Sequence, residues 1–361
     1  MDRFSTVCGW ALTCGFVLFG ATARSQTLEN YYIYVSNERS DNVTVIDAAT
    51  RETVATIPAG KRPRGIHLSP DGKTVYVAVS GTPPEPPPKL DANGNPIFQK
   101  GHDDDDVDDK NADKSADGIA VIDVAQRKLV GKLPAGSDPE QFAVSADGAR
   151  LFISNEDVGT ASVLNIASGK VEKIIPVHKE PEGAGVRPDG KVFYITCETD
   201  GEIFAVDAST FKVITHFNVG GRPRSVDFLP DGSRAFIPSE SAGQLHVIDA
   251  VNHQVLETIA LPKGSRPMCV RVSPDGKKVY AGAGRAGTIC VMDAQTHKVL
   301  NTIKAGKRPW GIIISPDGKF LYSANGPSND ISVIDLATET EVQRIPAGAS
   351  PWGILLVPKV F

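Results

Sequence analysis

The residues best suited to chemistry follow a proline that recurs along the chain in short polar loops. The position after that proline varies in type where a purely structural repeat would keep one residue. It is occupied by Arg64, Glu140, Glu182, Arg224, Met268, Trp310 and Trp352. Such a charged ring is suited to bind a small anion or an acidic protein patch. The alternative is that the Arg and Glu side chains pair with one another and only order the fold.

Two of these positions are tryptophans, Trp310 and Trp352, and both lie in a Pro-Trp-Gly sequence. Paired indole rings form a platform for a flat ligand or a partner loop. The alternative is that they fill space between neighbouring units.

Acidic residues suggest two metal sites. Asp104, Asp106 and Asp108 alternate beside His102, and clustered carboxylates suit Ca²⁺ or another divalent cation. Because no EF-hand glycine or closing glutamate follows, a solvated acidic loop is the competing interpretation. A second set could bind a divalent cation with His178 as a base, as in a hydrolase or lyase; its members are Glu140, Glu156, Glu182 and Glu198.

The sequence lacks the common catalytic motifs. It has no Gly-x-Ser-x-Gly elbow, no Cys-x-x-Cys-His haem site and no phosphate-binding loop. The aspartates that end nearly every third strand, such as Asp47, recur with the repeat and indicate turn chemistry. We therefore assign no catalytic residue from the sequence.

The elements that must position these residues are β-strands. The unit from Lys307 to Gly348 contains four short apolar or alternating runs, joined by turns such as Ser315–Gly318. The aspartate that ends the third strand, replaced by Asn165 in one unit, recurs at intervals of 42 or 44 residues, except for 76 between Asp47 and Asp123. Four-stranded units repeating near 40 residues predict an all-β, seven-bladed β-propeller of antiparallel blades.

The two ends of the repeat array complement each other. The segment 32–37 reads as a second strand without a first, and 350–356 as a first strand without a second. Pairing of these N-terminal strands with the C-terminal strand would close the ring. The long interval comes from a Pro-rich acidic insertion loop at about 81–117, which has too little apolar sequence to fold alone.

Composition bounds the remaining possibilities. A net charge of −5 argues against nucleic acid as a partner. Residues 1–25 have the basic start, apolar run and small-residue end of a cleaved signal peptide, so we expect a periplasmic or secreted protein comprising 26–361. No membrane span is expected in that mature chain, and we expect a monomer. Its three cysteines, Cys197, Cys269 and Cys290, allow at most one disulfide and are expected to be buried thiols.

The repeats resemble the YVTN-repeat propellers, through 34–37 (YVSN), 42–47 (NVTVID) and the recurring Ser-Pro-Asp-Gly turns. The loops 62–65 (RPRG), 180–183 (EPEG) and 325–330 (NGPSND) are similar to propellers associated with quinoprotein (PQQ-dependent) alcohol catabolism. That resemblance implies a periplasmic binding or scaffold protein whose partner is a dehydrogenase or cytochrome. The alternative is a metal-dependent propeller enzyme of the lactonase or lyase type, acting through channel-mouth glutamates.

Overall fold

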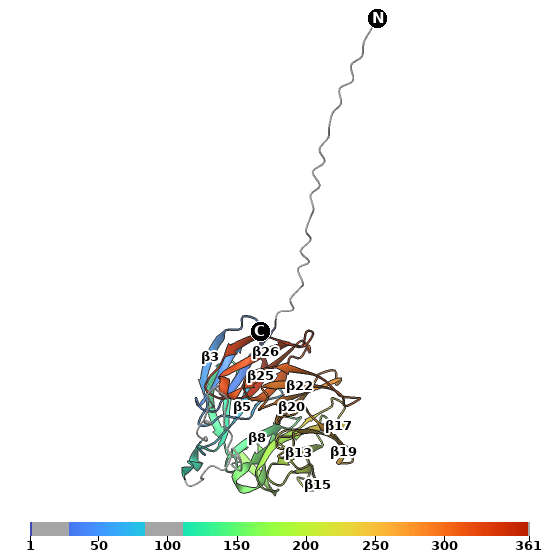
Figure 1. The fold of residues 1–361 in the computed structure, drawn as a ribbon. Helices are drawn as coiled ribbons and strands as arrows, with labels where there is room; N and C mark the ends of the chain where they lie inside the picture. Colours follow the sequence, from blue (N-terminus) through green and yellow to red (C-terminus); the bar gives the residue numbers. More distant parts are fainter. Residues whose placement is uncertain (2–28, 84–110, 360–361) are drawn as a thin grey trace.

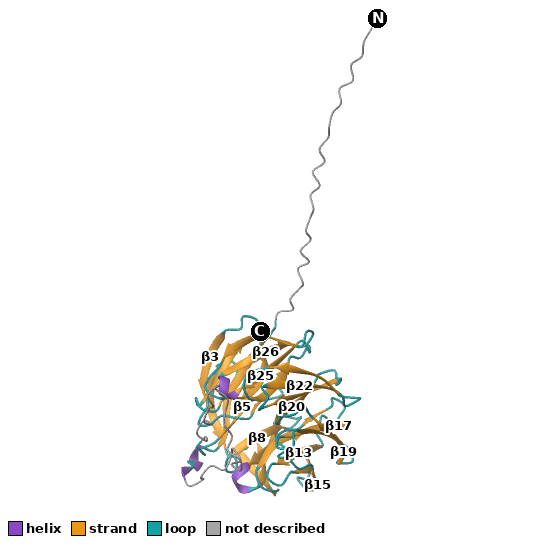
Figure 2. Ribbon diagram, viewed as in Figure 1, coloured by secondary structure: helices purple, strands orange, loops and turns teal. Residues whose placement is uncertain are grey.

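The chain folds as a β-propeller. The computed structural model describes Met1, residues 29–83 and residues 111–359. Within these residues the strands form seven four-stranded antiparallel sheets, which are the blades (Figure 1). Figure 2 shows that strands and loops make up nearly all of the described chain. The short 3-10 helices are η2 (Lys114–Ala116), η3 (Glu156–Val158) and η4 (Gly326–Ser328).

The first three blades each run from an inner to an outer strand in chain order. Blade 1 contains β4 (Ile66–Leu68), β5 (Thr74–Val79), β6 (Gly118–Asp123) and β7 (Lys128–Leu133). Blade 2 contains β8 (Pro139–Val144), β9 (Arg150–Asn155), β10 (Thr160–Asn165) and β11 (Lys170–Pro176). Blade 3 contains β12 (Pro181–Val186), β13 (Val192–Cys197), β14 (Glu202–Asp207) and β15 (Val213–Asn218).

The next three blades repeat this order. Blade 4 contains β16 (Asp227–Phe228), β17 (Arg234–Ser239), β18 (Gln244–Asp249) and β19 (Gln254–Ala260). Blade 5 contains β20 (Pro267–Val272), β21 (Lys278–Ala283), β22 (Thr288–Asp293) and β23 (Val299–Lys304). Blade 6 contains β24 (Pro309–Ile314), β25 (Phe320–Asn325), β26 (Asp330–Asp335) and β27 (Thr340–Pro346).

The seventh blade joins the two ends of the chain, as the sequence predicts. Its strands are β28 (Pro351–Pro358), β1 (Tyr31–Asn37), β2 (Asn42–Asp47) and β3 (Thr53–Pro58), in that order. Ile33 pairs with Leu356 in the antiparallel register. The blue and red ends of the colour scale therefore meet in Figure 1. This pairing closes the ring and leaves no inner strand as an open edge.

The apolar core is divided among the spaces between blades. One cluster joins Tyr34 and Val45 of the seventh blade to Ile66 and Val77 of blade 1, and all four are buried. Alternate residues of a strand point to opposite sheet faces, so each middle strand contributes to two such clusters. The three expected thiols are buried and free, with no disulfide. Because the strands supply this core, the residues that vary between units lie mainly in the loops.

The strand order gives the propeller two distinct faces. The xPDG turns join the first and second strands of a blade, and they lie on what we call the turn face. The entry loops that precede each first strand lie on the opposite face, which we call the mouth face, together with the ends of the second strands. The two faces are connected through the centre of the ring of inner strands.

The insertion begins and ends on the mouth face. The Asp113 amide donates to the Gly81 carbonyl at 3.0 Å, and the Gly81 amide donates to Asp117 Oδ1 at 2.8 Å. Residues 84–110 of the expected loop, including Asp104, Asp106 and Asp108, lie outside the described residues, as do residues 2–25 of the expected signal peptide. Among the described residues no helix has the length and apolarity needed to cross a membrane.

Candidate functional site

The backbone before each inner strand adopts the same unusual conformation. The residue immediately before the recurrent proline has positive φ in every blade, at Arg62, Asp138, Glu180, Arg222, Arg266, Arg308 and Ser350. Non-glycine residues rarely take this left-handed conformation, so the entry loop is held by its surroundings. The sharp bend brings the residue after each proline to the mouth-face end of the central channel, which we call the channel mouth.

At the channel mouth, Arg64 is enclosed by carboxylates of blade 2. The guanidinium group of Arg64 donates to Asp138 and Glu140, and its Nη1 lies 3.4 Å from Glu156 Oε2. The Arg64 residue is fully buried, at 0% exposure. Arg62 adds a second cation, 2.9 Å from Glu38 and 3.3 Å from Asp138. The cluster therefore fastens blade 2 to blade 1 and to the seventh blade.

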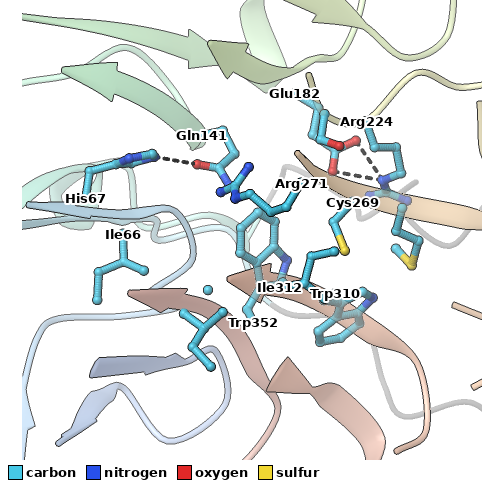
Figure 3. A pocket seen from close by; sticks show the side chains of 15 residues that line it. Ile66, His67, Gln141, Glu182, Arg224, Cys269, Arg271, Trp310, Ile312 and Trp352 are labelled. Atoms are coloured by element: carbon cyan, nitrogen blue, oxygen red, sulfur yellow. Dashed lines mark hydrogen bonds and ion pairs between the residues drawn. The ribbon is translucent and has the colours of Figure 1, made fainter. Parts of the chain in front are cut away.

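A second cluster surrounds Arg224 of blade 4. Arg224 Nε donates to Glu182 at 2.8 Å (Figure 3), and its Nη1 donates to Glu240 at 3.0 Å. Glu198 lies 3.7 Å from the same nitrogen and also accepts a hydrogen bond from Arg222. Four of the seven predicted ring residues thus pair with charged neighbours across blade boundaries, which is the alternative that the sequence left open.

Burial and neighbouring charges give the carboxyl groups of these clusters different pKa values. Burial raises the pKa of Glu140 to about 7, although Arg64 opposes the shift. For Asp138, burial is outweighed by Arg64 and Arg62, and the pKa falls below its ordinary value. Burial, together with the neighbouring Glu198, raises the pKa of Glu182 well above its ordinary value. Asp138 is therefore the ionised partner of Arg64, and Glu140 and Glu182 take up protons first.

The three apolar ring residues lie on blades 5, 6 and 7. Met268 is buried, and Trp310 and Trp352 are half-buried. The Arg308 guanidinium lies 5.2 Å from the centre of the Trp310 ring. A Cβ atom on Gly326 would lie 2.6 Å from a carbon of that ring, so this glycine permits the close packing. Trp310 consequently packs against its own blade, and both Trp310 and Trp352 line a central cavity.

Below the mouth, the inner strands enclose two cavities that meet. The mouth cavity has about 50 Å³ and is lined by residues that include Glu182, Arg224, Trp310 and Trp352. The second cavity has about 400 Å³ and reaches the turn face at Pro70 and Ala146. Four residues line both cavities, and we call them the waist: His67, Gln141, Ser225 and Arg271.

Arg271 differs from the arginines of the mouth. Its Nη1 donates to the carbonyl of Val270 at 3.1 Å, and it forms no ion pair with any described residue. In Figure 3 its guanidinium group lies between the His67–Gln141 pair and the Glu182–Arg224 pair. An arginine cannot lose its charge in a protein. The waist therefore holds a permanent cation with unused hydrogen-bond donors.

His67 lies beside this cation. Its Nε2 is 3.3 Å from Gln141 Oε1, and its ring packs edge-on against Phe142. Burial, and secondarily the charge of Arg271, lower the pKa of His67 to about 4. The imidazole is thus neutral at physiological pH, and one nitrogen can accept a proton.

The waist residues can be recognised in the sequence at a second recurrent position, which lies beyond the residue that follows each proline. Four residues beyond each proline, the inner strands read His67, Ala143, Gly185, Asp227, Arg271, Ile313 and Leu355. Three titratable residues at one inner-strand position depart from the apolar pattern of blades 6 and 7. Aligning the units at this position would have identified His67, Asp227 and Arg271 as candidates.

The acidic residues proposed as metal ligands have other partners. Glu140 faces Arg64, Glu182 faces Arg224, and Glu198 accepts from Arg222. His178 lies away from them, 3.2 Å from Glu202. Over residues 29–83 and 111–359, no group of three or more His, Cys, Asp or Glu side chains is arranged to hold a metal ion. The mouth glutamates, which pair with arginines, do not fit a divalent-cation site.

We expect Arg64→Met to cost about 3–5 kcal/mol of stability at pH 8, because Glu140 would stay buried without its main counter-charge and Asp138 would keep only Arg62. Without Arg64, the folded-state pKa of Glu140 rises further above its unfolded value, and the pKa of Asp138 loses the larger of the two charges that lower it. The folded state then binds more protons, so the deficit relative to wild type shrinks as the pH falls to 5.

Urea unfolding at both pH values measures this deficit. Arg150→Met is the matched control, because Arg150 and Glu172 form an exposed pair at 2.8 Å and such pairs contribute about 1 kcal/mol or less. Equal losses in the two variants, or a deficit independent of pH, would contradict the compensation of buried charge.

Comparison with solved structures places the fold among known propellers. Hydrazine synthase of Kuenenia stuttgartiensis aligns with a TM-score of 0.70 at 17% identity, covering 88% of this chain and 99% of that chain. A putative 6-phosphogluconolactonase of Bacteroides fragilis aligns at 0.71 and 19%, covering 92% and 99%. Another from Bacteroides uniformis aligns at 0.69 and 17%, covering 91% and 100%. At these identities the likeness concerns the fold alone.

Sequence comparison is more specific. No protein with a curated description matches the chain significantly. The sequence model of the family described as "Lactonase, 7-bladed beta-propeller" matches residues 27–188 and 202–344, which span most of the chain. The chain belongs to this seven-bladed β-propeller lactonase family.

Proposed function

We propose that the protein is a lactonase-type hydrolase whose reaction takes place at the channel waist. The observation that carries the proposal is Arg271, a channel arginine without an ion pair, beside a neutral His67. Family membership and the two solved structures titled putative 6-phosphogluconolactonases support the same class of reaction.

The reaction that these groups suit is hydrolysis of a cyclic ester. Water adds to the carbonyl carbon, the ring C–O bond breaks, and the ring oxygen takes a proton and leaves as a hydroxyl group. The products are a hydroxy-carboxylate and one released proton. Negative charge develops first on the carbonyl oxygen and then on the carboxylate, and a fixed guanidinium group stabilises both.

Each waist residue has a distinct part in this scheme. His67 accepts a proton from the attacking water, because its ring is neutral at the working pH. Gln141 holds His67 in place through the 3.3 Å contact between Nε2 and Oε1. Arg271 binds the carbonyl oxygen. Ser225 contributes a buried hydroxyl that has no hydrogen-bond partner among the described residues.

A non-catalytic binding role is the second candidate. In this reading the protein is exported and serves a quinoprotein oxidation system through a periplasmic dehydrogenase or cytochrome. The observation in its favour is the charged rim of the mouth face, where Lys61 and Asp113 form an ion pair at 2.7 Å and both side chains are exposed. Absence of lactone turnover by the wild-type protein, with partner capture that needs the mouth face, would favour it.

We expect Arg271→Met to lower kcat/KM for lactone hydrolysis by about 100-fold or more, because an oxyanion would lose its only cation at the waist. The proton released in each turnover allows the rate to be measured by pH-stat titration, after subtraction of spontaneous hydrolysis. Arg344→Met is the control, because Arg344 lies on outer strand β27 and pairs with Glu341. Full activity of the Arg271 variant would refute the assignment.

The titration of His67 predicts the acid limb of the pH–rate profile. The wild-type kcat/KM should fall below pH of about 4, where His67 takes up a proton and can no longer act as a base. His67→Gln keeps a polar side chain but removes the base, and it should lower the rate by about 100-fold to 10,000-fold. A variant that retains both the rate and the acid limb would remove His67 from the mechanism.

A further inference from the structure

The two cavities of the channel differ in what they can hold. Small-molecule sites usually have roughly 300–1,000 Å³. The cavity on the turn face, at about 400 Å³, falls within this range, and we call it the turn-face chamber. The mouth cavity, at about 50 Å³, holds a few water molecules at most. Of these two cavities, only the turn-face chamber has room for a lactone.

The channel mouth is closed by buried ion pairs. Arg64, Glu140, Glu182, Arg224 and Met268 are all at most 8% exposed. A ligand entering between them would have to separate buried charges from their partners, which is costly because the desolvated charge is left alone. The mouth-face end of the channel is therefore a structural seal.

The turn-face chamber is open because two inner strands carry small residues. Blades 2 and 3 have Ala143 and Gly185 at the position where blades 6 and 7 have Ile313 and Leu355. Gly185 cannot be enlarged, since a Cβ atom there would lie 2.7 Å from Val226 Cγ1 of the next blade. The chamber is consequently displaced from the axis toward blades 1 to 4.

The charges of the turn-face chamber limit its ligand. Of the residues that line it, Arg271 is the one arginine, Asp227 the one carboxylate, and no lysine is among them. Asp227 is held by main-chain amides of Phe228 at 3.0 Å and Val272 at 2.8 Å. Burial raises the pKa of Asp227, although the charge of Arg271 opposes the shift. One cation can balance a single carboxylate, whereas the second charge of a phosphate dianion would have no cation among the lining residues. Asp227 and Gln141 can instead accept and donate hydrogen bonds to hydroxyl groups.

We propose that the turn-face chamber is the ligand site, entered from the xPDG turns, and that it takes an uncharged hydroxylated lactone and its monoanionic hydroxy acid. This inference rests on the proposed function for the reaction, but ligand binding can be tested without turnover. A phosphorylated sugar lactone is the ligand class that the charges disfavour.

The native thiols should not interfere with a thiol-labelling test. Cys197, Cys269 and Cys290 are buried, and burial raises the pKa values of Cys197 and Cys269 to about 12. They should be inert to a bulky maleimide. Ala146→Cys places a reactive thiol at the rim of the turn-face chamber, and Lys307→Cys places one on the mouth face, in an exposed part of an entry loop.

Calorimetry with D-gluconate as the probe measures binding before and after labelling. We expect label at position 146 to weaken gluconate binding by at least 10-fold and label at 307 to leave it unchanged. We also expect 6-phosphogluconate to bind the unlabelled protein at least 10-fold more weakly than gluconate. Ala143→Leu, which copies the bulk found in blade 7, should reproduce the loss without a label.

Each contrary result has its own meaning. Loss of binding on mouth-face labelling alone would overturn the turn-face route. Tighter binding of 6-phosphogluconate would overturn the ligand class, and no binding of either acid would overturn the site. Wild-type protein that binds gluconate but does not hydrolyse gluconolactone would refute the proposed function and leave the turn-face chamber as a binding site.

Discussion

Compensation of buried guanidinium groups by carboxylates is the interaction on which the arrangement of the channel depends. Arg64 and Arg224 each collect carboxylates from neighbouring strands, and both are nearly inaccessible to solvent. Removing Arg64 would leave Glu140 buried without an ion-pair partner, and removing Arg224 would do the same to Glu182, so each cluster stabilises several blades at once. The same pairing occupies the residues that would otherwise make the mouth face attractive to an anion.

Arg271 differs from Arg64 and Arg224 because it forms no ion pair with a described residue, and this difference makes it the candidate for ligand binding. It comes from an inner strand of the same repeat, yet its hydrogen-bond acceptor is a backbone carbonyl, and the nearby carboxyl group of Asp227 forms no ion pair with it. A guanidinium group with unused donors in a cavity is suited to bind negative charge. The fold thereby separates two tasks, because the mouth arginines hold the ring together and the waist arginine faces the open space of the turn-face chamber.

The sequence predicted the architecture because the fold repeats. The spacing of the aspartates after the third strands, and the unpaired ends at 32–37 and 350–356, were sufficient to predict seven blades and their closure. The sequence offered Arg–Glu pairing as an alternative but could not say which residues pair, since Arg64 and Glu140 are 76 positions apart and meet only through blade packing. Arg271 stands out in the sequence only when the units are aligned at its position, and its lack of an ion pair depends on the packing around it.

Anomalous scattering from crystals soaked in bromide would test the central claim most directly, since bromide reports where a cation lacks a partner. The account predicts a bromide ion at the guanidinium group of Arg271, reached from the turn face, and none at Arg64 or Arg224. Bromide bound at the mouth arginines, with the waist left without it, would contradict the account.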